Sequence, residues 1–202
     1  MIFLVWGGVA SASDLPTLYA VIGIPNDQVL AIQSAPAEES ETLAAFRFNA
    51  SGVEVVNFSK DGAWGQVNLA ETSGWVLMKH LTPFPADTAT RMTCFGNEPF
   101  WTLELGPETT GTWKTPDSDG MVSFKKADSG RIASGEIRMT EASVLSGAHV
   151  PFEATITPQI CSDGMSDRVF GLSTEILLKG YSGFASPDGD QTRSGCCSIS
   201  LP

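Results

Sequence analysis

Apolar and polar residues alternate with a period of two along much of the second half of the chain. In residues 101–105 every second residue is large and apolar, and the residues between them are Thr102 and Glu104. Side chains of a strand point alternately to its two faces, so this pattern predicts a β-strand with one buried face. The same alternation recurs in residues 152–156 and 174–178. Glycine-rich connections separate such segments, and we therefore expect an antiparallel barrel or sandwich of about seven or eight strands.

The first half contains shorter runs of Val, Ile, Trp and Phe between turn-forming residues, and helical periodicity is nearly absent. One of the turns is Lys60-Asp61-Gly62, because an Asp-Gly pair supplies the positive φ of a tight hairpin. Short strands with a long connection at residues 35–45 predict a small barrel. We expect these strands at residues 18–24, 29–33, 53–58, 64–68 and 75–78. The whole chain is thus predicted to be all-β.

Residues 83–91 have the composition of a linker, with two prolines followed by small polar residues. This linker divides the chain into a first domain, residues 13–82, and a second domain, residues 92–202. Domains of this size gain only marginal stability from hydrophobic burial. We therefore expect covalent cross-links that stabilise these domains.

The start of the chain predicts export. Residues 2–10 are apolar and uncharged, and Ala10-Ser11-Ala12 is a small-x-small sequence of the kind that signal peptidase cuts after. We expect residues 1–12 to be a signal peptide and the mature protein to begin near Ser13, in the periplasm or outside the cell. No Lys or Arg precedes the apolar run, and the alternative is a buried first strand. Since no cysteine follows the small residues, a lipid anchor on the membrane is not expected.

The net charge excludes one class of partner. Lys and Arg total 12 against 23 Asp and Glu, which gives a formal net charge of −11. Such a chain is repelled by phosphate backbones and by anionic lipid surfaces. We therefore expect no nucleic-acid partner and no attachment to a membrane surface.

The cysteines predict two disulfides. Cys196 and Cys197 are neighbours, so on a strand they face opposite sides and each needs its own partner. The partners are then Cys94 and Cys161, with two cross-pairings open, of which we prefer Cys161–Cys196 and Cys94–Cys197. Closing loops of these lengths contributes roughly 3 to 5 kcal/mol each in a chain-entropy model. Zinc is not expected, since the chain has no Cys-x-x-Cys pair, and no metal or cofactor is predicted.

A charged cluster surrounds these cysteines. Asp163, Asp167 and Arg168 follow Cys161 closely, and Glu98 follows Cys94. Two carboxylates and a guanidinium can bind a polar ligand or serve as acid and base. The structural interpretation, which we favour, is that Asp163 begins a turn, Asp167 caps the chain, and Arg168 pairs with Glu98 or Asp167.

Three segments of the first half resemble the bacterial SH3-like domain. They are residues 29–36, Trp64-Gly-Gln-Val67 and Gly74-Trp75-Val76, in the family's order and at its spacing. Gln33 stands where the family usually has Arg, and His80 stands where it often has Tyr. The resemblance implies a small barrel whose groove accepts peptides.

The tryptophans offer candidate ligand contacts in that groove. Large aromatic side chains in small domains usually complete the core, and this is the preferred interpretation for each of them. Trp75 is the best exception, and we add Trp64 and His80 as ligand-binding candidates on the strength of the resemblance.

The second half also resembles a known family. Glu98-Pro-Phe-Trp101, residues 161–168 and Gly195-Cys-Cys197 are similar to motifs of an uncharacterised family of bacterial envelope proteins. This resemblance covers residue 92 to the C-terminus and implies no particular activity.

The sequence therefore favours an exported, non-enzymatic envelope protein that binds a peptide or cell-wall fragment through its SH3-like domain. One alternative is an inhibitor or chaperone-like partner of another envelope protein, acting through residues 163–168. Another is a hydrolase that uses Glu98 with Asp163 or Asp167. No nucleophile elbow, phosphate-binding glycine loop or His-Glu-x-x-His helix occurs in the chain.

Overall fold

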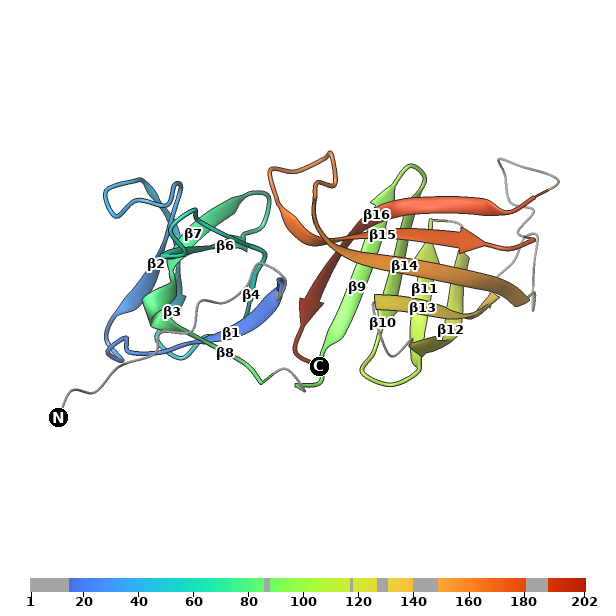
Figure 1. Ribbon diagram of the computed structural model, residues 1–202, viewed down its shortest axis with the longest axis horizontal. Coiled ribbons are helices and arrows are strands. Elements are labelled where there is room, and N and C mark those ends of the chain that lie inside the picture. Colours follow the sequence, from blue (N-terminus) through green and yellow to red (C-terminus); the bar gives the residue numbers. More distant parts are fainter. Residues whose placement is uncertain (1–14, 86–87, 117, 127–130, 140–148, 181–188) are drawn as a thin grey trace.

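The computed structural model describes residues 15–85, 88–116, 118–126, 131–139, 149–180 and 189–202. The predicted signal peptide, residues 1–12, lies outside the described residues. The described part is all-β apart from one short 3-10 turn, η2 (Met78–His80). Figure 1 shows the first half of the chain beside the second half, which forms a barrel. Among the described residues, no helix is long and apolar enough to cross a membrane.

Two antiparallel sheets make up the first half. One sheet has the strand order β4-β1-β8 and the other has the order β3-β2-β7-β6-β5. The strands are β1 (Thr17–Val21), β2 (Val29–Gln33), β3 (Thr42–Arg47), β4 (Ser51–Val55), β5 (Asn57–Phe58), β6 (Trp64–Asn68), β7 (Ser73–Leu77) and β8 (Leu81–Pro83). Most of their buried side chains, chiefly Val, Leu and Ile, form one core. Burial of this apolar surface is the main force that holds the two sheets together.

Strands β2 and β6 occupy the residues predicted for them, whereas the predicted connection at residues 35–45 was wrong in part. It contains the start of β3, which pairs with β2 in an antiparallel register. Ala44 and Phe46 of this edge strand pack partly buried against the core, and the opposite face is exposed. Residues 43–46 are all apolar, so the sequence lacks the alternation that marks a strand with one buried face. The turn at Lys60-Asp61-Gly62 is present, and Gly62 has a φ of 70° there.

The second half is a closed barrel of eight antiparallel strands. Each strand pairs with the next along the chain, and β16 returns to pair with β9. The strands are β9 (Arg91–Asn97), β10 (Phe100–Leu105), β11 (Thr110–Thr115), β12 (Ser118–Lys126), β13 (Arg131–Met139), β14 (His149–Cys161), β15 (Phe170–Leu178) and β16 (Gln191–Ser200). Closure leaves none of these strands with an unpaired edge. The prediction of an antiparallel barrel or sandwich is confirmed, and the structure is a barrel.

Side chains fill the barrel interior. The alternation predicted for residues 101–105 is confirmed, since Trp101, Leu103 and Leu105 are buried and face inward. Trp101 stacks on Trp113, with ring centroids 5.4 Å apart. Glycine at position 96 makes this possible, because a Cβ there would lie 2.4 Å from Nε1 of Trp101. Eight strands enclose just enough space for such a packed core.

Both disulfides form in the pairing that the sequence favours. Cys94 lies directly opposite Cys197 across the seam that closes the barrel, and both are fully buried in its core. Cys196 points the other way and bonds to Cys161 at the end of β14. One bridge therefore lies inside the barrel wall, and the other ties the connection after β14 to its outside.

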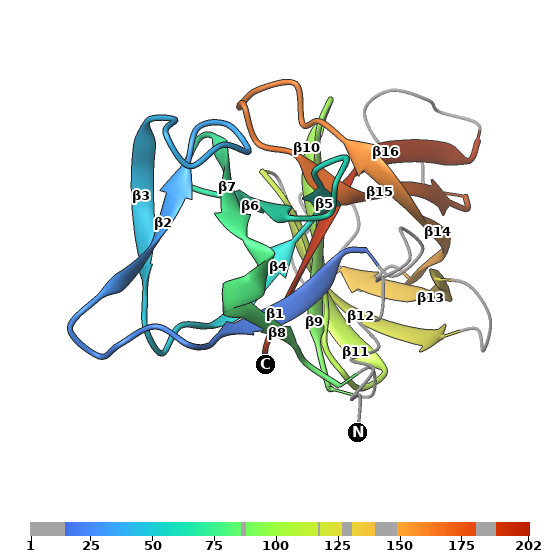
Figure 2. The same cartoon turned by 60° about the vertical axis from the view of Figure 1, so that its left-hand side comes forward.

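The two halves make direct contacts. Strand β4 lies against β16, where the main-chain N–H of Ile199 donates a 2.8 Å hydrogen bond to the carboxyl of Glu54. Burial raises the pKa of Glu54 to about 7, against the lowering effect of that hydrogen bond. A second contact joins the turn between β6 and β7 to the connection between β14 and β15, as Figure 2 shows.

Candidate functional site

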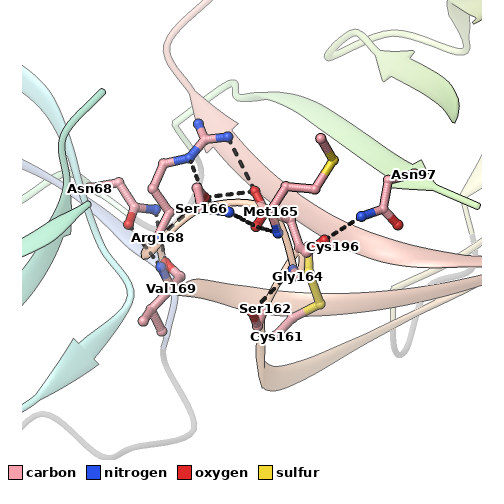
Figure 3. A network of polar contacts seen from close by, with 11 residues as sticks. Asn68, Asn97, Cys161, Ser162, Gly164, Met165, Ser166, Arg168, Val169 and Cys196 are labelled. Atoms are coloured by element: carbon pink, nitrogen blue, oxygen red, sulfur yellow. Dashed lines mark hydrogen bonds and ion pairs between the residues drawn. A yellow bond between two sulfur atoms is a disulfide. The ribbon is translucent and has the colours of Figure 1, made fainter. Parts of the chain in front are cut away.

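The connection between β14 and β15, residues 162–169, is the centre of the candidate site, and we call it the connecting loop. The Cys161–Cys196 bridge fixes its first end to β16. Close to this end, the main-chain oxygen of Asp163 accepts a 2.6 Å hydrogen bond from the side-chain amide of Asn97, the last residue of β9. Figure 3 shows these two attachments close to Gly164, which follows them in the chain and has a φ of 69°. Glycine adopts this left-handed conformation without the strain of a side chain.

The carboxylate of Asp163 organises the loop from within. Its Oδ1 accepts hydrogen bonds from the main-chain N–H groups of Met165 (3.0 Å) and Ser166 (2.9 Å). Its Oδ2 accepts a 2.8 Å bond from the Ser166 hydroxyl and forms a 3.4 Å ion pair with Arg168. Burial by itself raises the pKa of Asp163, but the bonds from Ser166 and Met165 and the charge of Arg168 outweigh it and lower the pKa. The carboxylate is therefore held ionised, as a structural group.

Arg168 links this network to the barrel surface. Besides its ion pair with Asp163, its Nε donates a 3.2 Å hydrogen bond to the Ser166 hydroxyl. Its guanidinium lies over the ring of Phe170, 5.1 Å from the centroid, and that ring packs edge-on against Phe95. The expected pairing of Arg168 with Glu98 or Asp167 was wrong, because Asp163 is the ion-pair partner that the described residues show.

The last part of the connecting loop holds the first half of the chain. The side chain of Asn68 donates a 2.8 Å hydrogen bond to the Val169 carbonyl and accepts a 3.1 Å bond from the Val169 N–H. The main-chain N–H of Asp167 donates to the carbonyl of Glu71, and its carbonyl accepts from the Ser73 hydroxyl. Asp167 thus contributes its backbone to the contact between the two halves.

A groove of about 1170 Å³ runs along the outer face of the barrel beside this loop. We call it the barrel groove. Outward-facing residues of β9, β14, β15 and β16 form its floor, and the connecting loop forms one wall. Glu71 is the residue that the first half contributes to its lining. Its lining includes Phe95, Phe100, Thr155, Thr157, Gln159 and Ser173.

The sequence-predicted site residues fall into three groups. Asp163 and Arg168 line the barrel groove, and Asp167 lies beside it. Glu98 is exposed in the hairpin next to Asn97. The candidates of the first half lie elsewhere and do not line the groove. Among these, Trp64 is only 6% exposed, whereas Trp75 and His80 are half-buried.

The arrangement gives little support to acid–base chemistry. A general acid at neutral pH needs a raised pKa, and the pKa of Asp163 is lowered by partners that fix it in place. Among the described residues, no three His, Cys, Asp or Glu side chains come together where they could hold a metal ion.

The sequence interpretation missed most of the groove. Thr155 and Thr157 alternate with the buried residues of β14, and Ser173 faces outward on β15. The alternation in residues 152–156 places Thr155 on the outer face, but it does not extend to Thr157 or Ser173 and could not show that these hydroxyls share a surface with β9 and β16.

Comparison with known proteins gives no match: no protein-family model, no curated protein and no solved structure is significantly similar to this chain.

Proposed function

We propose that the chain is an exported, non-enzymatic envelope protein that binds a peptide or a cell-wall component in the barrel groove. The groove itself is the observation that carries this proposal. Binding sites are concave, largely preformed and few per protein, and this groove, at about 1170 Å³, is slightly larger than the usual ligand pocket. Two disulfides support an oxidising compartment.

The connecting loop supports binding because it is already ordered. A disulfide, the Asp163 network and the contact with Asn68 hold it from three directions. A wall fixed in this way loses little conformational entropy when a ligand arrives, and such preorganisation favours affinity.

Apolar side chains at the groove support the same proposal. Phe100 and Met165 line it and are 54% and 66% exposed. Large apolar groups that face water beside a concave polar surface are typical of interaction sites. The SH3-like resemblance points to the first half instead, and a substitution at Trp75 distinguishes the two locations.

Filling the groove tests the proposal. Thr157→Trp places a large ring on an exposed position of β14 that lines the groove, whereas Ile160→Trp places it on an exposed position outside the lining. The full-length, oxidised protein is mixed with purified cell-wall sacculi and with a panel of extended peptides, and the bound fraction is measured. We expect Thr157→Trp to abolish binding and Ile160→Trp to preserve it. Failure of the wild-type protein to bind either material would contradict the proposal.

A further inference from the structure

The polar side chains of the barrel groove are mainly uncharged. Nine Ser and Thr residues line it, together with the amides of Asn97 and Gln159, against three acidic and two basic residues. Two of the charged residues, Asp163 and Arg168, already neutralise each other. Hydroxyl and amide groups both donate and accept hydrogen bonds, so such a lining matches a ligand that carries many hydroxyls of its own.

An aromatic ring lies among these hydroxyls. Phe100 lines the groove with 54% of its surface exposed, so its ring can make a new contact without unfolding its neighbours. A pyranose ring presents polar hydroxyls at its edge and an apolar face of C–H groups, and that face stacks well on an aromatic ring. The combination of hydroxyls, amides and an accessible ring therefore fits a sugar.

Other ligand classes fit the groove less well. Extended peptides commonly add a strand to an open sheet edge, but every strand that forms the groove floor already pairs on both sides within the closed barrel. Anionic ligands face a protein of net charge −11. From these observations we infer that the barrel groove binds an uncharged oligosaccharide. This inference rests on the proposed function and narrows it to one class of ligand.

The test uses the full-length, oxidised protein and calorimetric titration with short neutral oligomers of N-acetylglucosamine, glucose and xylose. Oligomers of galacturonic acid serve as the negatively charged control for the neutral sugars. The peptide panel represents the alternative class of ligand. We expect at least one neutral series to bind and the anionic series not to bind. Phe100→Ala should weaken binding about tenfold, through the loss of aromatic stacking. Met121→Ala, a similarly exposed apolar side chain outside the groove lining, should leave binding unchanged.

Three results would overturn the inference. If the anionic series binds as tightly as the neutral ones, the ligand is not selected for lack of charge. If Phe100→Ala binds the sugar with unchanged affinity, the sugar does not bind in the barrel groove. Peptide binding that Thr157→Trp abolishes, with no sugar binding, would overturn the inference and leave the proposed function standing. No binding of sugars, sacculi or peptides would overturn both.

Discussion

The two halves of the molecule reach a folded state by different means. The first half packs two open sheets around an aliphatic core, and its described residues contain no cysteine. The second half closes its strands into a barrel, stacks two tryptophans inside it and carries both disulfides. The first half therefore depends on side-chain packing and on its contact with the barrel, whereas the barrel is stabilised by covalent bonds and by a continuous hydrogen-bond ladder. The candidate groove lies on the half with the covalent bonds.

Removal of the disulfide at the barrel seam should have the largest effect on stability, and it tests this difference between the two halves most directly. The loop that Cys94 and Cys197 close spans 103 residues. The double substitution Cys94→Ala and Cys197→Ala should therefore cost about 4 kcal/mol of barrel stability. Hydrogen exchange resolved by segment measures each half separately. We expect protection to fall across β9–β16 and to change little in β1–β8, and an equal loss in both halves would show that they unfold as one unit.

Two tryptophan substitutions sharpen the comparison within the first half. Trp64 is 6% exposed, so Trp64→Ala should cost about 3 kcal/mol or more in the free energy of unfolding. Trp75 is half-buried, and Trp75→Ala should cost about half as much. Chemical denaturation monitored by circular dichroism measures both.

The Trp75→Ala variant also locates the ligand site. If the barrel groove binds the ligand, Trp75→Ala should fold and keep its affinity for sacculi or sugars. A folded Trp75→Ala protein that no longer binds would place the site in the first half, as the SH3-like resemblance implies.

A smaller effect is expected where the two halves meet at Glu54. The pKa of this carboxyl is raised from 4.5 to about 7 in the folded protein. A raised pKa means that the folded state favours the protonated form. Its stabilising contribution is complete below about pH 4.5 and is lost as the pH rises through 7. Because the side chain is half-buried, we expect a loss of about 1 kcal/mol, below the limit of roughly 3 kcal/mol that this shift sets.

Glu54→Gln keeps the carbonyl that accepts from Ile199 and removes the ionisation. At pH 8 it should therefore raise the melting temperature, and it should flatten the dependence of stability on pH between 4.5 and 7. Glu39→Gln, at an exposed position of the first half, is the matched control and should change neither quantity. A Glu54→Gln protein with the same pH dependence as the wild type would refute this role for Glu54.

Local patterns and long-range contacts differ in how far the sequence reveals them. The inward faces of β10, β14 and β15 follow from alternation, and the adjacency of Cys196 and Cys197 requires separate partners. The edge strand β3 was missed in part, because its apolar residues 43–46 occupy both faces and leave no period-two signal. The two hydrogen bonds between Asn68 and Val169 join residues 101 positions apart. No local pattern marks them, so the role of the connecting loop could be described only from the structure.

The connecting loop also has a consequence for how the molecule responds to a ligand. Five of its eight residues line the groove, and Asp167 and Val169 in the same loop hold the first half through Glu71 and Asn68. Binding free energies at two coupled positions are reciprocal. A ligand that stabilises the loop in its present conformation must therefore strengthen the attachment of the first half, and detachment of that half must weaken the ligand by the same factor. Ligand binding in the groove and attachment of the first half therefore belong to one thermodynamic cycle. Mechanical separation of the two halves would lower the affinity for the ligand.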